Sequence, residues 1–207
     1  MGDILLYFIA AFCFIAVLSF VYFISNVRNS RLLLATPNIN EINAIITIYR
    51  EIRINAPADE VFEVISRGKE AFSPVIKYEW DSASDDGTPN DGSKGLVKLN
   101  IEGFGVRDIP VELTLLDREK RKMADKTLTY PSWLFCSETV QEVIPVVGKE
   151  KNYCDYRLWR TFEGIASYYL LITPTRIDIA EALRESAYDL KAYMELNSKK
   201  PRRSQTY

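Results

Sequence analysis

Six successive strand-like segments dominate the chain between residues 75 and 162. They cover residues 75–80, 95–101, 111–117, 122–130, 138–146 and 153–162. Most of the connections between them are short and carry turn-forming residues. Short connections join antiparallel neighbours, whereas parallel strands need long crossovers. This order predicts an antiparallel meander, which constrains the fold more than any other feature of the sequence.

One further strand precedes the meander and runs directly into a helix. Residues 46–54 place isoleucines at alternate positions, the pattern of a half-buried strand. Pro57 then suits the first turn of a helix, and Asp59 and Glu60 favour its positive N-terminus. Residues 69–74 predict a second short helical turn. We therefore expect two short helices between the first and second strands.

A long amphipathic helix is predicted after the last strand. Apolar residues recur there at steps of three and four, at Ile179, Leu183, Ala187, Leu190 and Met194. A curved sheet of seven strands needs a cover for its concave face, and this helix is long enough to supply it. The predicted fold class is α+β: a seven-stranded curved antiparallel sheet, two short helices and a long C-terminal helix.

Residues 4–24 form an apolar run without a charged side chain. A helix of about 21 residues rises roughly 31 Å, which matches a hydrocarbon core of about 30 Å. A cleaved signal peptide is the alternative, but a basic segment before the run and a small-residue cleavage site after it are both missing. We therefore expect one N-terminal transmembrane helix. Arg28 and Arg31 follow it, so the positive-inside rule predicts that the remaining chain faces the cytosol.

Four regions follow from these patterns: a transmembrane anchor at residues 1–26, a linker at 27–43, a folded domain at 44–198 and a basic tail at 199–207. The leucine run at residues 31–35 predicts either a short helix on the membrane surface or a packed linker. The basic tail either contacts anionic lipid head groups or is solvated. Residues 130–136 are apolar and aromatic, and they either enter a bilayer, line a cavity entrance or fold back onto the core.

Composition excludes several classes of function. The net charge of −2 argues against nucleic acid as a partner, and the absence of histidine removes the commonest general base and metal ligand. The three cysteines form no C-x-x-C pair, so neither a metal site nor a cofactor is expected, and Cys136 and Cys154 are predicted to be buried reduced thiols. The loop at residues 81–95 matches neither a phosphate-binding loop nor a calcium loop.

Mid-strand carboxylates are the remaining candidates for acid–base chemistry. They are Glu51, Asp125, Glu142 and Asp155. Their neighbours predict solvent-facing positions, so no acid–base pair stands out and we expect no particular residue to be catalytic.

The order of elements and two motifs resemble the START-like superfamily, the helix-grip (SRPBCC) proteins that include polyketide cyclase/dehydrase and lipid-transport domains. The front motif consists of Ile54, Ala56, Pro57, Ala58, Glu60, Val61, Phe62, Val64 and Ile65. The rear motif consists of Phe162, Gly164, Ala166 and residues 190–195. The resemblance implies a deep apolar cavity between sheet and terminal helix, which members use for lipids, sterols, quinones, aromatic hormones or polyketides.

Strand alternation then gives the candidate cavity wall. It comprises Ile76, Tyr78, Trp80, Val97, Leu99, Ile101, Leu113, Leu115, Tyr156, Leu158, Phe162, Leu183, Ala187 and Leu190. The alternative is an ordinary filled core, and a slip of one residue in register would exchange the two faces.

The sequence thus favours a membrane-anchored domain that binds, and in an extended role transfers, a lipid or other hydrophobic small molecule. One alternative is a cyclase/dehydratase-like enzyme acting on a hydrophobic substrate. Another is a membrane-surface interaction module with a filled core. The sequence does not indicate the oligomeric state.

Overall fold

The predicted elements can be compared with a computed structural model. It describes residues 32–67, 73, 76–81, 89–101, 105–150 and 152–198, with residues 9, 12–15, 18, 19 and 22 near the N-terminus. The second helical turn expected at residues 69–74 falls almost wholly outside the described residues. The basic tail and most of the apolar run at residues 4–24 also lie outside them.

The elements follow the predicted order. They are β1 (Ile46–Ile54), α2 (Ala58–Arg67), β2 (Ile76–Trp80), β3 (Lys94–Ile101), β4 (Gly105–Asp117), β5 (Lys122–Thr127), β6 (Cys136–Pro145), β7 (Cys154–Glu163), the 3-10 helix η1 (Ile165–Tyr168), α3 (Tyr169–Ile172) and α4 (Thr175–Ser198). The α+β class, the seven-stranded antiparallel sheet and the long C-terminal helix are therefore confirmed.

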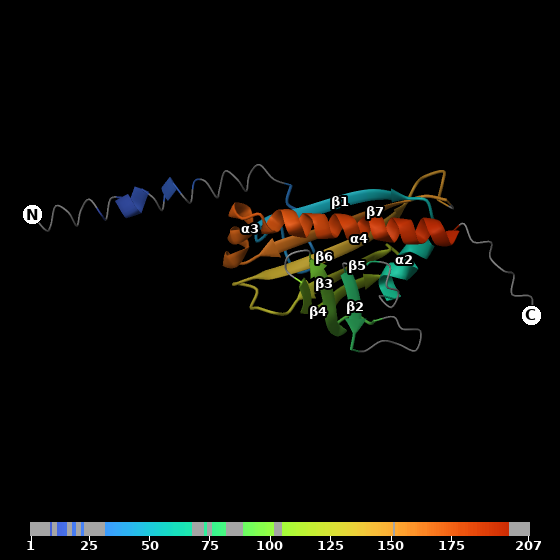
Figure 1. The fold of residues 1–207 in the computed structure, drawn as a ribbon, viewed down its shortest axis with the longest axis horizontal. Helices are drawn as coiled ribbons and strands as arrows, with labels where there is room; N and C mark the ends of the chain where they lie inside the picture. The colour runs from blue at the N-terminus through green and yellow to red at the C-terminus, as the bar shows by residue number, and fades with distance from the viewer. Residues whose placement is uncertain are drawn as a thin grey trace, which may run out of the picture. The chain divides into compact units, whose positions relative to one another are not determined.

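The sheet is a meander closed at one edge by the first strand. Its order is β1-β7-β6-β5-β4-β3-β2, and every neighbouring pair is antiparallel. β1 therefore pairs with the last strand of the meander, with Ile46 opposite Phe162 and Ile54 opposite Cys154. Figure 1 shows α4 running across one face of this sheet, with α2 near the C-terminal end of α4 and α3 near its N-terminal end.

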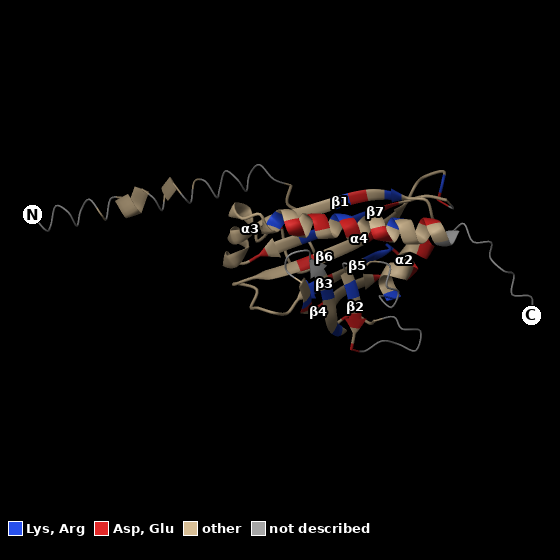
Figure 2. Ribbon diagram, viewed as in Figure 1, with Lys and Arg blue, Asp and Glu red and all other residues tan. Residues whose placement is uncertain are grey.

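The main core lies between α4 and the inner face of the sheet. The predicted stripe of α4 is buried at Leu183, Ala187, Leu190 and Met194, and it packs in one cluster with inward residues of the strands. Burying one such leucine contributes roughly 1.5–3 kcal/mol. In Figure 2 acidic and basic residues follow one another along the side of α4 turned to the viewer. The helix is thus amphipathic, as its spacing predicts.

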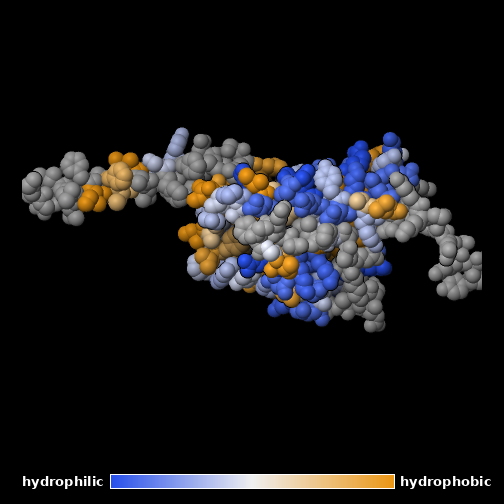
Figure 3. Space-filling view, viewed as in Figure 1, coloured by the Kyte–Doolittle hydropathy of each residue, from blue (hydrophilic) through white to orange (hydrophobic). Residues whose placement is uncertain are grey.

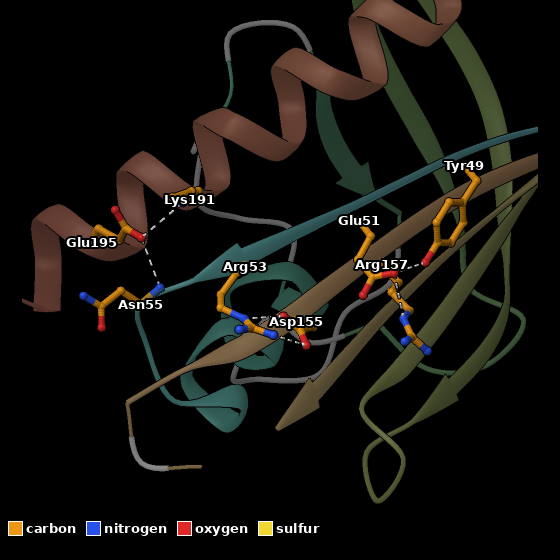
Figure 4. Close-up of polar contacts among 8 residues, drawn as sticks. All are labelled: Tyr49, Glu51, Arg53, Asn55, Asp155, Arg157, Lys191 and Glu195. Carbon is orange, nitrogen blue, oxygen red and sulfur yellow. Dashed lines mark hydrogen bonds and ion pairs between the residues drawn. The ribbon is translucent and has the colours of Figure 1, made fainter. Parts of the chain in front are cut away.

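Charged pairs cover the outer face where β1 meets β7. Arg53 holds Asp155 through two hydrogen bonds, from Nε to Oδ1 at 2.8 Å and from Nη2 to Oδ2 at 3.0 Å (Figure 4). Glu51 accepts a hydrogen bond from the hydroxyl of Tyr49 and lies 3.4 Å from Nε of Arg157. Such surface pairs contribute about 0–1 kcal/mol each. The pairing of β1 with β7 brings these side chains together, and the ion pairs themselves do not set the register.

The C-terminal part of α4 is tied to the end of β1. Glu195 accepts a hydrogen bond from the backbone N–H of Asn55 at 3.1 Å and lies 3.8 Å from Nζ of Lys191, one turn earlier in the helix (Figure 4). Asn55 begins the turn that leads into α2. This contact therefore fixes α4, β1 and α2 at one end of the domain.

Residues 33–44 are packed on the outer face of the sheet. The indole Nε1 of Trp159 donates to the carbonyl of Ala35 at 3.3 Å, and Oγ1 of Thr161 donates to that of Leu34 at 2.8 Å. Leu34 also joins an outer cluster with Ala124, Val140 and Trp159. Residues 32–36 form no helix. Of the two predictions for the leucine run, the packed linker is the one that the described residues support.

A buried carboxylate anchors this segment. Glu138 is fully buried in β6 and accepts hydrogen bonds from the backbone N–H and Nδ2 of Asn38, each at 2.8 Å, and from the hydroxyls of Thr36 and Thr114. A buried charge is costly unless it is well hydrogen-bonded, and these four bonds offset that cost.

No helix within the described residues is long and apolar enough to cross a membrane. The described residues of the apolar run, among them Phe12 to Ile15, are helical. The N-terminal anchor therefore stays a prediction of the sequence.

We predict that Glu138→Ala destabilises the domain by about 3 kcal/mol, because it removes the acceptor of four hydrogen bonds from Thr36, Asn38 and Thr114. Urea unfolding followed by tryptophan fluorescence measures this. Glu142 lies on the same strand and face but is partly exposed, paired at 3.8 Å with Lys122. Glu142→Ala is the matched control and should cost less than about 1 kcal/mol. Equal effects of the two substitutions would contradict the anchoring role of Glu138.

Candidate ligand-binding site

A partly open pocket lies between the inner face of the sheet and the first turns of α4. Its volume is about 480 Å³, within the range of about 300–1,000 Å³ typical of ligand pockets, and its surface is mostly apolar. It is lined by Leu99, Arg107, Asp108, Ile109, Thr127, Thr129, Tyr130, Phe135, Ser137, Arg160, Phe162, Thr175, Asp178 and Ile179. The inner face of the sheet is therefore not completely filled in this part of the fold.

The mouth of the pocket is shaped by a close contact between the β5–β6 loop and the end of β7. Gly164 has a φ of +91°, and a Cβ there would lie 2.6 Å from the backbone of Ser132 and of Leu134. Only glycine allows this approach without strain. It lets the N–H of Ile165 donate to the carbonyl of Trp133 at 3.0 Å. The loop is thereby held in one position beside η1.

Residues 130–136 show two of the three predicted arrangements. Phe135 turns inward, packs against Phe162 with ring centroids 6.0 Å apart, and lines the pocket. Tyr130 also lines the pocket, whereas Trp133 is 71% exposed. The segment therefore both folds back onto the core and forms part of the pocket mouth.

The inner end of the pocket is polar. Arg160 is buried in β7, and its Nε donates to Oγ1 of Thr139 in β6 at 2.7 Å. Ser137 and Thr127, from β6 and β5, add further hydroxyls to the lining. An apolar pocket that ends in a buried guanidinium suits an amphipathic molecule whose polar end accepts hydrogen bonds.

A second polar group lies on the same face of the sheet. The hydroxyl of Tyr78 donates to Oδ1 of Asp125 at 2.9 Å, while Asp125 Oδ2 has no hydrogen-bond partner among the described residues. Burial raises the pKa of Asp125 from 3.8 to about 6, and Arg160 and the Tyr78 bond oppose part of this rise. Burial and the nearby Asp125 also hold the pKa of Tyr78 well above its usual value.

The solvent-facing position predicted for Asp125 is wrong, because this side chain is only 1% exposed. Asp125 lies opposite Thr139 and shares the inner face with Met123 and Thr127. Alternation alone would have placed it there. Its neighbours along the strand led to the opposite prediction.

A small inner chamber lies deeper than the pocket. Its volume is about 10 Å³, room for about one water molecule at most. It is lined by Ile76, Tyr78, Thr139, Gln141, Tyr156, Leu158, Arg160, Leu183 and Ser186. Arg160 lines both spaces and so separates them. The Tyr156 hydroxyl donates to Oε1 of Gln141 at 2.7 Å, which satisfies two of the polar groups in the chamber.

The predicted wall residues whose side chains are described fall into four groups. Leu99 and Phe162 line the pocket. The inner chamber receives Ile76, Tyr78, Tyr156, Leu158 and Leu183. The core cluster around these spaces contains Trp80, Val97, Leu113, Ala187 and Leu190. Ile101 lies in β3, and its side chain is not among those described.

Leu115 forms the fourth group, since it packs on the outer face with Trp159, Ala124 and Val140. The register between β4 and β5 shifts between Leu113 and Leu115. A bulge of this kind moves every following residue to the other face. The alternation of strand residues in the sequence cannot reveal such a bulge.

Metal ligands and cysteine thiols can also be checked among the described residues. Within the described part of the chain, no group of three or more Cys, Asp or Glu is placed to hold a metal ion. Cys136 and Cys154 are free and buried, as predicted. Burial raises the pKa of Cys136 to about 11 and that of Cys154 to about 12, so both are unreactive at neutral pH.

This fold and pocket place the domain in a structural class rather than a family. No protein-family model and no curated protein matches the chain. Solved structures with the START-like helix-grip fold do match it. All those described below are less than 25% identical, so they show the fold alone.

Three of these structures illustrate the class. Norcoclaurine synthase from Thalictrum flavum, solved with dopamine and hydroxybenzaldehyde, is 18% identical, with a TM-score of 0.55 over 83% of this chain and 100% of that one. A START superfamily protein from Mycobacterium smegmatis is 13% identical, with a TM-score of 0.55 over 73% and 98%. The di-domain ARO/CYC BexL is 14% identical, with a TM-score of 0.57 over 75% of this chain and 48% of that one.

Asp125 predicts a pH dependence of stability. Its pKa in the folded protein is raised, so the folded state binds the proton more tightly than the unfolded state does. Stability is therefore lost as the pH rises from 3.8 to about 6. A difference of about 2 in pKa corresponds to about 3 kcal/mol. Asp125→Asn removes this dependence, so its stability relative to wild type should rise by about that amount between pH 4 and 7.

Urea unfolding of both proteins across this pH range measures the difference. Glu79→Gln is the control for sign, because hydrogen bonds from Lys77 and Lys98 lower the pKa of Glu79 to about 2. Stability from Glu79 is lost as the pH falls from 4.5 towards 2. This variant should therefore run parallel to wild type between pH 5 and 7, and any deviation below pH 5 should have the opposite sign. An Asp125→Asn difference that stays flat with pH would show that Asp125 is not a buried titrating group.

Proposed function

We propose that the domain binds an amphipathic hydrophobic small molecule or lipid between the sheet and α4. The carrying observation is the pocket of about 480 Å³, mostly apolar and ending at the buried guanidinium of Arg160. A filled interaction module would leave no such space. The apolar part of the ligand would lie against Leu99, Ile109 and Phe162.

The driving force for this binding is removal of apolar surface from water, worth roughly 25 cal/mol per Å². Arg160, Ser137 and Thr127 would orient the ligand by donating hydrogen bonds to its polar end. The inner chamber would stay out of reach, because its volume of about 10 Å³ admits no ligand.

The solved structures support a small-molecule role without naming the ligand. Norcoclaurine synthase was solved with dopamine and hydroxybenzaldehyde, two aromatic molecules. The Mycobacterium smegmatis protein carries the START name. These likenesses concern the fold, so the ligand of this chain has to be inferred from its own pocket.

An enzyme acting on a hydrophobic substrate is the second candidate. Asp125 is buried, its Oδ1 accepts a hydrogen bond from Tyr78, and its Oδ2 has no partner among the described residues, which favours this candidate. The occurrence of an enzyme on this fold also favours it. However, Asp125 does not line the pocket, and Tyr78 lines only the inner chamber. A general acid or base must reach its substrate. Binding without chemistry therefore fits the described geometry better.

A membrane tether is the second part of the proposal. It is supported by the uncharged run at residues 4–24 and by Arg28 and Arg31 beyond it. Tethering would raise the concentration of the domain at the membrane that supplies a lipid-like ligand. The domain would face the cytosol.

We predict that Ile179→Trp, which places a large side chain in the pocket, weakens binding at least tenfold. The ligand is first identified by mass spectrometry of small molecules that copurify with the full chain, and its affinity is then measured for each variant. Leu196→Trp is the matched control, because Leu196 belongs to the same helix, is exposed and does not line the pocket. Absence of any copurifying or extractable apolar molecule would refute the binding function.

We also predict that protease digests the domain in sealed microsomes without detergent, because the charge bias places it on the cytosolic side. The measurement is immunodetection of fragments before and after permeabilisation. A lumenal marker protein should resist digestion until detergent is added. Protection of the domain together with that marker would overturn the proposed orientation.

A further inference from the structure

Large apolar side chains stand exposed around the mouth of the pocket. We call them the apolar rim: Tyr130, Trp133, Ile165, Tyr169, Ile172 and Ile177, each between 54% and 71% exposed. Scattered exposed apolar residues are normal on a protein surface, but a contiguous group indicates a binding surface. Figure 3 shows apolar atoms gathered where Figure 1 labels α3, at one end of the domain.

Backbone contacts join the elements that carry the rim. The N–H of Ile165 donates to the carbonyl of Trp133, and the N–H of Ala166 donates to that of Leu134 at 2.8 Å. η1 leads directly into α3, and only Thr173 and Pro174 separate α3 from α4. Tyr130 and Thr175, at the two ends of this arrangement, line the pocket. The rim is therefore one surface that borders the mouth.

The chain enters the domain at this same end. The N–H of Ile45 donates to the carbonyl of Phe162 at 2.9 Å, two residues before Gly164 and η1. Leu33 packs against a cluster that contains Cys136, which follows directly on the loop that carries Trp133. Eight residues lie between Ile24, the end of the apolar run, and Leu33, so nine Cα–Cα steps join the two. Fully extended, they span roughly 30 Å.

We propose that the apolar rim docks into the surface of the bilayer to which the apolar run attaches the chain, with the pocket mouth facing the lipid. This rests on the proposed function and names the partner of the same pocket. The short tether keeps this end of the domain, rather than the end closed by Asn55 and Glu195, within reach of a bilayer. A bilayer is therefore the occupant that the tether continually presents to the rim.

The chemistry of the rim fits a membrane interface. Trp133 and Tyr169 have an apolar body and a polar tip, which favours the head-group region. Ile165, Ile172 and Ile177 supply apolar surface that would enter the acyl boundary. A ligand could then pass between the lipid and the pocket without crossing water.

Tryptophan fluorescence of the full chain in phosphatidylcholine vesicles tests the docking. The chain has three tryptophans, and Trp133 is the exposed one, while Trp159 is buried and Trp80 is partly buried. We expect brominated phosphatidylcholine to quench Trp133 and iodide in the water to have little access to it. Trp133→Phe should abolish the bromine effect, since the remaining two tryptophans lie within the domain.

Serine substitutions then test the surface. Ile165→Ser with Ile172→Ser should reduce the bromine quenching at least twofold. Val147→Ser is the matched control, because Val147 is 93% exposed in the β6–β7 turn at the other end of the domain. It should leave the quenching unchanged. Because all three side chains are exposed, these variants are expected to fold.

The outcomes separate this proposal from the proposed function. Trp133 that is open to iodide and unaffected by brominated lipid would overturn the docking, even if a copurifying ligand upholds the binding function. Trp133 shielded from both quenchers would overturn it too, in favour of a protein that covers the rim. Bromine quenching that is unchanged in the double serine variant would show that the rim does not bring Trp133 to the lipid. Quenching without any apolar ligand would uphold docking and refute the binding function.

Discussion

One long helix, α4, covers most of the inner face of a seven-stranded sheet, with α2 packed in the same core, and most of the structure follows from that constraint. α4 fills the face from its third turn onward, where Leu183, Ala187 and Leu190 are buried. Its first turns, from Thr175 to Ile179, leave the pocket beneath them. Protein interiors otherwise close-pack, so a mostly apolar space of this size that opens to the surface is available to a ligand.

Both faces of the sheet carry buried polar groups, and these groups differ in how completely they are satisfied. On the outer face, Glu138 has four hydrogen bonds and fastens the segment that precedes β1. On the inner face, Asp125 keeps one oxygen without a partner among the described residues, which explains why burial dominates its pKa. A satisfied carboxylate stabilises a structure, whereas an incompletely satisfied one costs free energy. Asp125 costs free energy where it lies, so its position tells more about function than that of Glu138 does.

The sequence predicts the framework of this fold because period-two alternation and turn residues are local signals. They located all seven strands and the stripe of α4. The sheet bulge after Leu113 is not a local signal, since it depends on how β4 meets β5, and it moves Leu115 to the outer face. The neighbours of Asp125 misled the prediction of its position. The inward position of Arg160 was not predicted, because the wall was sought among apolar residues. The pocket itself arises from packing between distant elements, which no spacing rule describes.

The two ends of α4 are held differently, and the pocket opens at only one of them. At the C-terminal end, Glu195 binds the backbone of Asn55, and the buried stripe of the helix reaches Met194. At the N-terminal end, Pro174 separates α4 from the single turn of α3, and the first turns of α4 lie over the pocket rather than over filled core. A ligand too large for the mouth would enter by moving this end and the adjoining η1 and α3. The same elements carry the apolar rim, so contact of the rim with a bilayer would favour the arrangement in which the mouth is open. Ligand uptake would then be coupled to the membrane that supplies the ligand.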